Sequence, residues 1–270
     1  MRRLVWTSDT HLDRMARSEF LEFIEYLQEL NADGFVLAGD IAEADSVISF
    51  LTEFRQQLDC PIYFVLGNHD FWGSTFAETR AAICEFVSKQ IDIHWLSESG
   101  VVSLNETTAL IGHDGWADGG YAPVPTTGTV PQDFRCIEDL KILRRDQFQT
   151  ALSNLGKEAA EYLKKNLSEA VKTYQNIYLV THFPPFKEAS LDRARRVCSN
   201  ERLPFYSCKA IGDVLLEIMS QNPDSNLTVL SGHTHEKCEL EIQSNLKIKI
   251  LDAGYGAWYP PGILEISSHK

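Results

Sequence analysis

The chain has 270 residues, a net charge of −13 and 44% hydrophobic residues. A chain of this length buries roughly three-quarters of its unfolded surface, which is enough for one large domain with a sizeable core. No apolar stretch approaches the ~18 residues that a membrane-spanning helix needs, and the negative charge opposes binding to nucleic acid. These features predict a soluble protein and argue against a membrane protein or a DNA-binding protein.

The N-terminal segment and the cysteines predict a cytoplasmic location. In MRRLVWTSDTHLD, polar residues interrupt a short apolar run and no small-residue cleavage pattern follows, so we expect no signal peptide. The six cysteines lack CxxC spacing, and the chain is too long to depend on disulfides, which is typical of reduced thiols in a cytosol.

The first part of the chain alternates short apolar runs with helical patterns. Residues 3–8, 34–38 and 62–66 are typical of strands buried on both faces, whereas residues 18–30 and 44–58 have helical periodicity. The expected N-cap and apolar stripe of the first helix are Ser18, Phe20, Leu21, Ile24, Leu27 and Leu30. This alternation predicts parallel strands joined by right-handed crossovers.

The rest of the chain predicts further helices and strands around one long irregular segment. The expected elements are a helix at about 74–90, a hairpin turning at Asn105 and Glu106, a loop at 113–134, a helix-like stretch at about 135–171, a strand at 176–182, a helix near 208–221, a strand at 226–235 and antiparallel strands from residue 238 onward. A loop of that length is usually functional or mobile. Without repeats or linkers, we expect one α/β domain over residues 1–270 with mixed sheets.

Polar clusters stand at the ends of five apolar runs. They contain Asp9 and His11, then Asp40, then Asn68, His69 and Asp70, then His182, and finally His233 and His235. In open α/β sheets, ligands bind beyond the carboxyl ends of the strands. We therefore expect these five strand ends to form one site.

The residue types in these clusters indicate metal chemistry. Imidazole and carboxylate are common ligands of Zn, Mn and Fe, and the set is too large for a single ion. Two ions about 3.5 to 4 Å apart, bridged by a carboxylate and a hydroxide, would leave an excess of roughly two positive charges for an anionic substrate.

Each cluster taken alone also has a structural interpretation. GNHD is compatible with a type I turn, DTH with a capping loop, Asp40 with a helix cap and His182 with a core histidine. Their concentration at strand ends favours metal binding. The other histidines, His94, His113 and His269, lack this setting and are expected to be structural, His113 least firmly because it opens the long loop.

In order along residues 9–235, the motifs Asp-x-His, GDIAE, GNHD, a histidine after an apolar strand, and GHTH resemble the calcineurin-like metallophosphoesterase superfamily. The resemblance implies a four-layer αββα sandwich of two mixed β-sheets flanked by helices. It also implies two metal ions, Mn, Fe or Zn, with ligand sets that share Asp40 as the bridge. One set is Asp9, His11, Asp40 and His235; the other is Asp40, Asn68, His182 and His233.

In that family the histidine of GNHD faces the substrate instead of binding metal. Because a leaving alkoxide needs a proton, His69 is the expected general acid. Asp70 is expected to orient His69 through its other ring nitrogen, or alternatively to cap the helix that begins near Ser74.

Substrate contacts are harder to predict, because they lie outside the shared motifs. The segment 113–150 is interpreted as a lid or insert carrying His113, Asp114 and Trp116, or alternatively as a surface loop without contact to the site. The remaining candidates are Arg193, Arg195 and Arg196, which would bind a second phosphate or form a solvated helix face, and Tyr255, Trp258 and Tyr259, which would stack on substrate or pack in the core.

The predicted function is hydrolysis of small-molecule phosphomonoesters or phosphodiesters by a metal-bridging hydroxide, with His69 as general acid. A nuclease would use the same metals, but basic surfaces or added DNA-binding elements would be expected. A non-catalytic protein-interaction scaffold on the same fold would be expected to lose His69 or some ligands, and none is lost here. Neither a membrane nor nucleic acid is an expected partner.

Overall fold

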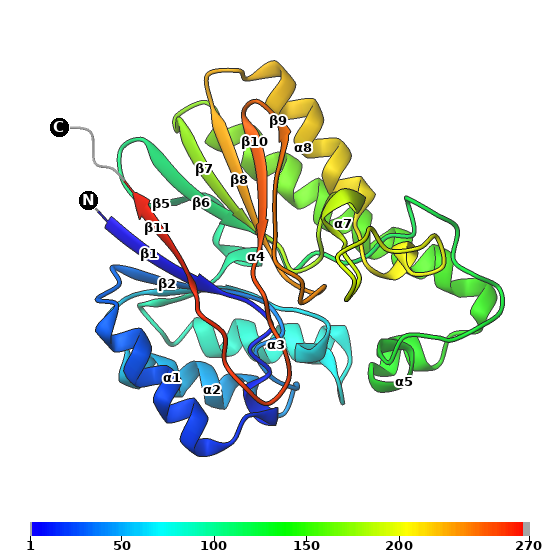
Figure 1. Cartoon of the computed structure of the whole chain (residues 1–270), viewed down its shortest axis with the longest axis horizontal. Coiled ribbons are helices and arrows are strands. Elements are labelled where there is room, and N and C mark those ends of the chain that lie inside the picture. The colour runs from blue at the N-terminus through cyan, green and yellow to red at the C-terminus, as the bar shows by residue number, and fades with distance from the viewer. Residues whose placement is uncertain (1, 267–270) are drawn as a thin grey trace.

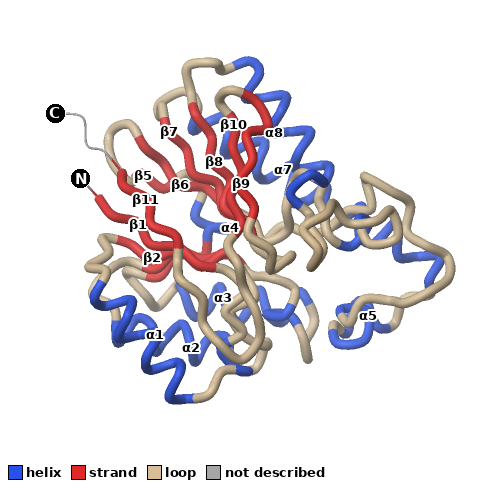
Figure 2. The backbone as a smooth tube through the Cα atoms, viewed as in Figure 1, coloured by secondary structure: helices blue, strands red, loops and turns tan. Residues whose placement is uncertain are grey.

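The computed structural model describes residues 2–266 and arranges them in four layers (Figures 1 and 2). Two β-sheets pack face to face. One group of helices, α1 (Arg17–Glu29), α2 (Val47–Gln57) and α3 (Phe76–Val87), covers the outer face of the first sheet. The long helices α7 (Phe148–Ala170) and α8 (Lys209–Gln221) cover the second. The predicted αββα sandwich is confirmed.

The first sheet consists of four parallel strands and one antiparallel edge strand. Its order is β11 (Gly262–Ile266), β1 (Arg2–Thr7), β2 (Gly34–Ala38), β3 (Ile62–Val65) and β4 (Ile93–Trp95), with β11 antiparallel to β1. The first three apolar runs therefore form parallel strands as predicted. The short strand β4, followed by α4 (Leu96–Ser99), was not predicted because its apolar run is too short to stand out.

The second sheet is also mixed. Its order is β5 (Val102–Ser103), β6 (Thr108–Gly112), β7 (Asn176–Val180), β8 (Asn226–Ser231), β10 (Leu246–Ile250) and β9 (Cys238–Gln243). The predicted β5–β6 hairpin is confirmed. The antiparallel strands predicted from residue 238 onward are present, since β9 pairs antiparallel with β10 and β11 pairs antiparallel with β1. In addition, β10 pairs parallel with β8, and β11 lies in the first sheet, neither of which was predicted.

Three apolar clusters separate the layers, and the alternation of side chains along the strands explains them. In β1, Val5 faces the helices, whereas Leu4 and Trp6 face the second sheet and pack in the same cluster as Val180 and Leu230. A third cluster joins the second sheet to α7 and α8. Strands buried on both faces require continuous apolar runs, which is why they were recognisable in the sequence.

Two helix predictions need correction. In α1, Ala16 occupies the N-cap position and Ser18 lies inside the helix. Leu21 is 43% exposed, and Phe23 takes the buried place instead, because the buried face is rotated towards Phe54 of α2. The helix-like stretch at 135–171 divides into α5 (Asp133–Cys136), α6 (Glu138–Lys141) and α7.

The two sheets bring the carboxyl ends of their central parallel strands to the same end of the sandwich. Loops collect there, and the segment around α5 extends on the side of the molecule away from both chain ends (Figures 1 and 2). Within residues 2–266, no helix combines the length and apolar character needed to cross a bilayer.

Candidate metal centre

Each of the five predicted clusters lies in a loop at the carboxyl end of a strand. Asp9 and His11 follow β1, Asp40 follows β2 and Asn68 follows β3; His182 follows β7, and His233 and His235 follow β8. The first five are buried, whereas His233 and His235 are partly exposed. The seven predicted metal ligands thus come together from both sheets.

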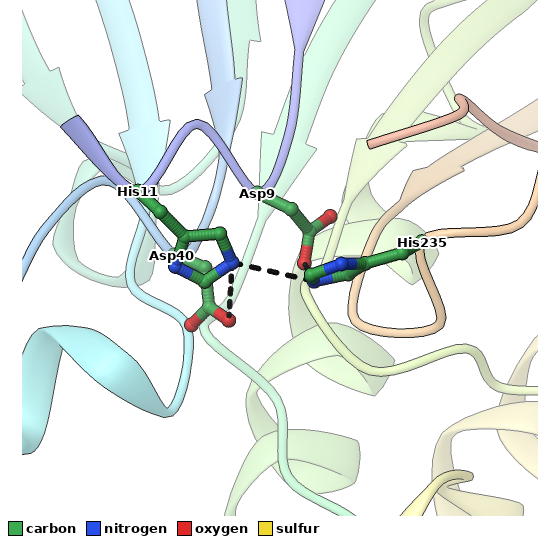
Figure 3. A group of neighbouring side chains, drawn as sticks. All are labelled: Asp9, His11, Asp40 and His235. Carbon is green, nitrogen blue, oxygen red and sulfur yellow. Dashed lines mark hydrogen bonds and ion pairs between the residues drawn. The ribbon is translucent and has the colours of Figure 1, made fainter. Parts of the chain in front are cut away.

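The first predicted ligand set forms a compact cluster. Asp9, His11, Asp40 and His235 each offer a ligand atom, and these atoms all lie within 4.8 Å of one another (Figure 3). His11 Nε2 lies 3.3 Å from His235 Nε2 and 3.7 Å from Asp40 Oδ2, and His235 Nε2 lies 3.3 Å from Asp9 Oδ1. The atoms converge on one point, as the ligands of a cation must.

The second predicted set converges in the same way. Asn68 Oδ1 lies 3.1 Å from His182 Nε2 and 3.0 Å from His233 Nδ1. His182 Nε2 is also 3.4 Å from Asp40 Oδ1. The two oxygens of Asp40 therefore face different ligand sets, Oδ1 towards His182 and Oδ2 towards His11, an arrangement in which one carboxylate can contact two cations.

The backbone at these ligands adopts a conformation that non-glycine residues rarely use. Seven non-glycine residues within 2–266 have positive φ, and five of them are predicted ligands: Asp9, His11, Asp40, His233 and His235, with φ between 41° and 70°. Such residues cost about 1–3 kcal/mol each and persist where the surrounding structure holds them. The concentration of strain at these side chains supports a functional role.

Two glycines allow the backbone to approach the carboxylates closely. A Cβ atom at Gly67 would overlap the Asp40 carboxylate, and one at Gly232 would overlap the Asp9 carboxylate. Both glycines precede a predicted ligand, which explains the glycine in GNHD and in GHTH.

The electrostatics of the cluster fit a bound cation. Burial lowers the pKa of His11 to about 4 and, together with the charge of His182, that of His233 to about 3, so both imidazoles keep a free lone pair at neutral pH. Burial raises the pKa of Asp9 and of Asp40, but His235 and His182 respectively outweigh it and hold both carboxylates ionised. Asp9, Asp40, His11 and His233 are thus in the forms that bind metal. Burial lowers the pKa of His182 and of His235, but Asp40 outweighs it and raises the pKa of His182 to about 10, and Asp9 likewise raises that of His235. These two imidazoles carry the positive charge between the carboxylates and lose a proton when they bind metal.

His69 borders the cluster without belonging to either set. Its Nε2 lies 3.9 Å from Asp40 Oδ2, and its ring stacks on Trp72 at a centroid distance of 3.6 Å. His69 Nδ1 is buried and has no hydrogen-bond partner within residues 2–266. The ring is therefore held by stacking.

The two roles considered for Asp70 were both wrong. Its Oδ1 accepts hydrogen bonds from the backbone N–H groups of Ile41 and Ala42, and its Oδ2 accepts one from Gly67 N–H. The carboxylate is thus committed to backbone donors and does not bind His69, while the cap of α3 is Thr75. Asp70 ties the loop after β2 to the loop after β3.

Sequence analysis missed one residue of the site, Asp133. The buried carboxylate accepts hydrogen bonds from Asn68 Nδ2 at 2.8 Å and from Trp72 Nε1 at 2.9 Å. The first bond fixes the amide so that Asn68 Oδ1 points at the histidines, and the second holds the ring that stacks on His69. Asp133 thus positions both a metal ligand and the candidate general acid.

We expect Asp133→Ala to weaken metal binding at the Asn68 site by about 10- to 100-fold, the usual loss when a partner of a metal ligand is removed. Competition with a chelator measures the affinity. Asp146→Ala is the matched control, because Asp146 lies in the same region of the chain but forms an exposed ion pair with Arg144. Unchanged affinity in Asp133→Ala would rule out the positioning role.

Three predicted substrate contacts are instead parts of the core. His113 Nδ1 accepts a hydrogen bond from Gly115 N–H, and the Asp114 carboxylate accepts bonds from Leu66 N–H and Trp95 Nε1. Trp116 is buried against phenylalanine rings. Their prediction as substrate contacts was wrong, because a polar or aromatic residue after a strand can be buried and bound by the protein itself, as Asp114 is through Oδ1.

The predicted arginines and aromatic residues have mixed outcomes. Arg195 pairs with Glu236 and Asp252, and Arg196 pairs with Asp192, so both are engaged by carboxylates and not free for a second phosphate. Both are exposed, as the alternative expected, but they lie in a turn and not on a helix. Tyr255 is 53% exposed, and its ring centroid lies 4.4 Å from that of His11. A role for Tyr255 in substrate binding stays a prediction.

Trp258 and His94 have structural surroundings. Trp258 packs on Phe23 and Tyr26, which supports the core alternative. His94 stacks on Tyr63, as a structural histidine would. His269 lies outside the described residues.

A cavity of about 210 Å³ opens beside the metal centre. His69, Trp72 and Tyr255 line it together with residues 131–133 of the long loop. Part of the segment 113–150 therefore borders the site, and its role as a lid stays a prediction.

Comparison with known proteins agrees with this geometry. A model of the calcineurin-like phosphoesterase family matches residues 2–237. No curated protein is similar enough in sequence to be matched.

Solved structures share the fold at low sequence identity. Phosphopantetheinyl hydrolase (PptH) from Mycobacterium tuberculosis is 14% identical with a TM-score of 0.64, covering 93% of this chain and 89% of its own. A dimetal phosphatase from Danio rerio is 11% identical with a TM-score of 0.57, covering 93% and 87%. The protein TT1561 of Thermus thermophilus is 16% identical with a TM-score of 0.53, covering 93% and 89%.

Since the family model spans most of the chain, this protein belongs to the calcineurin-like phosphoesterase family. It is a metallophosphoesterase, a hydrolase of phosphoric esters.

Proposed function

We propose that this enzyme holds two metal ions and hydrolyses phosphoesters of small molecules, either monoesters or diesters. The observation that supports this most strongly is Asp40, whose two carboxylate oxygens face two separate groups of ligand atoms. Asp9, His11 and His235 would hold one ion with Asp40, and Asn68, His182 and His233 the other. When bound, two such ions, Mn, Fe or Zn, supply a water of lowered pKa and positive charge for the phosphoryl oxygens.

We assign the protonation of the leaving oxygen to His69. Its ring faces the metal centre and lines the cavity beside it, where the ester would bind. Stacking on Trp72 limits the ring to one plane, and Asp133 holds Trp72 in turn. A positioned imidazole contributes about 10²- to 10⁴-fold to a step of this kind.

A hydrolysis screen tests the proposed function. The purified protein, reconstituted separately with Mn, Fe and Zn, is assayed on phosphomonoesters, cyclic and linear diesters, and pyrophosphates. We expect hydrolysis of at least one ester class that disappears on chelation. Absence of hydrolysis from every class with both sites occupied would instead favour the non-catalytic scaffold.

We expect catalysis to depend only weakly on ionic strength, because a small substrate makes few contacts to a protein of net charge −13. Because this net charge is negative, the protein should not retain duplex DNA at physiological salt. Gel-shift assays and rate measurements over a salt series check both points. DNA binding at sub-micromolar protein concentration, with an affinity that falls steeply with salt, would favour the alternative function as a nuclease.

The cytoplasmic location remains part of this proposal and is supported by the spacing of the cysteines. Fractionation of cells that express the tagged protein tests it.

A further inference from the structure

A second, larger cavity of about 570 Å³ adjoins the metal centre. The predicted ligands His233 and His235 form part of its wall, and Tyr206 and Tyr255 line both this cavity and the one beside His69. A substrate with its phosphoryl group at the metals can therefore extend its other end into this space. None of the predicted catalytic steps uses it.

Two arginines in the wall carry charge that no carboxylate balances. Arg193 lines the cavity and forms no hydrogen bond or ion pair with the described residues 2–266. Arg202 contacts only Tyr206 among those interactions, with Nη2 3.2 Å from the hydroxyl and the guanidinium 5.1 Å from the ring centroid. In an acidic protein, arginines without a carboxylate partner that face one cavity are notable, because most exposed arginines here form ion pairs.

The acidic side chains in the same wall are already paired. Asp192 binds Arg196 at 3.0 Å and Glu236 lies 3.9 Å from Arg195. Arg195 is shared with Asp252 at 3.4 Å, so these two outer arginines face three carboxylates and one negative charge is left over. Neither Arg193 nor Arg202 is drawn into these ion pairs, so their guanidinium groups remain for a ligand. Asp192 also accepts hydrogen bonds from the N–H groups of Ala194 and Arg196, which fixes the turn that carries Arg193.

We infer that this cavity is a subsite for a second anionic group on the substrate, which Arg193 and Arg202 bind. This inference rests on the proposed function and narrows it to phosphoesters that carry a further phosphate or carboxylate. Guanidinium groups bind both anions through paired N–H donors, and contact with Tyr206 holds the Arg202 side chain in place beforehand. Tyr206, Tyr255 and Tyr259 give the remaining wall hydroxyl and ring surfaces.

Binding of phosphonates tests the subsite without turnover, because their C–P bond resists ester hydrolysis. Calorimetry on the metal-loaded enzyme compares butylphosphonate with 4-phosphonobutyrate, which adds a carboxylate, and with propane-1,3-bisphosphonate, which adds a second phosphonate. Shorter and longer homologues of each cover the unknown span. We expect at least one two-anion series to bind about 10-fold or more tightly than its one-anion partner. The series that binds more tightly shows whether the subsite prefers a carboxylate or a second phosphonate.

The variant Arg193→Gln/Arg202→Gln should abolish that preference, and Arg193→Lys/Arg202→Lys should retain part of it. Arg144→Gln, which removes one exposed charge outside the cavity, is the control and should behave like wild type. With ester substrates, the Gln double variant should raise KM for two-anion esters by about 10- to 100-fold, while kcat changes little. The Gln double variant should hydrolyse p-nitrophenyl phosphate with the same kcat and KM as wild type, because this ester has no second anionic group.

The two possible failures are distinguishable. If wild type hydrolyses no ester, including p-nitrophenyl phosphate, the proposed function is wrong. If it hydrolyses esters but binds one-anion and two-anion phosphonates equally, or if the Gln double variant keeps the preference, the subsite is wrong and the hydrolase stands.

Discussion

Asp40→Asn should reduce bound metal from two ions per chain to less than one. The reason is geometric: Asp40 directs one carboxylate oxygen to each ligand set, Oδ2 at 3.7 Å from His11 Nε2 and Oδ1 at 3.4 Å from His182 Nε2. Asparagine keeps the shape and one oxygen that can accept from the backbone N–H of His69, so the fold should persist. It removes one negative charge and one ligand oxygen, which weakens both sites together.

Asn68→Ala is the matched comparison, since Asn68 contributes a neutral oxygen to one set only. Elemental analysis of both variants after reconstitution should find less metal in Asp40→Asn than in Asn68→Ala. Circular dichroism checks that both are folded. If Asp40→Asn still bound two ions per chain, Asp40 would not be the bridging ligand.

His69→Asn should leave both metals bound and slow the enzyme in a way that depends on the substrate. An alkyl phosphoester releases an alkoxide that needs a proton, so we expect a loss on the order of 10²- to 10⁴-fold in kcat/KM. A nitrophenyl ester leaves as a stabilised phenolate and should lose much less. The measurement is kcat/KM for both esters in both proteins, with metal content determined alongside.

Asp70→Asn provides the contrast for this experiment. Because the carboxylate binds backbone N–H groups and not His69, its substitution should slow both esters by the same factor. Equal losses in His69→Asn itself, or metal lost from it, would show that His69 acts through binding or coordination and not as an acid.

The gathering of these residues at one site could be predicted from the sequence because the signals are local, whereas their division into two ligand sets followed from the resemblance to the family. Each ligand follows an apolar run, and within each sheet parallel strands bring their carboxyl ends to the same edge. Asp9 and His182 follow strands of different sheets, so strand order places each at the carboxyl end of its own sheet, and the packing of the two sheets brings the side chains within 4.0 Å of each other.

Contacts made by the long loop could not be predicted in this way. Asp133 lies 65 residues from Asn68, and only the path of an irregular segment brings the two together. Asp114 shows the converse, a polar residue after a strand whose Oδ1 accepts hydrogen bonds from Leu66 N–H and Trp95 Nε1 and does not face the metal centre. A sequence pattern does not distinguish a side chain that binds a ligand from one that binds the protein's own backbone.

Arg193 and Arg196 illustrate the same limit for charge. They lie close together in one arginine-rich stretch, and the sequence offers nothing to separate them. In the structure, Arg196 pairs with Asp192, whereas Arg193 faces the cavity beside the metal centre.

Anomalous diffraction from crystals grown with excess Mn, Fe or Zn tests the two-metal site most directly. Two peaks about 3.5 to 4 Å apart are expected, one among Asp9, His11 and His235 and the other among Asn68, His182 and His233, with Asp40 bonded to both. A single peak at saturating metal, or two peaks that do not share Asp40, would contradict the dinuclear centre.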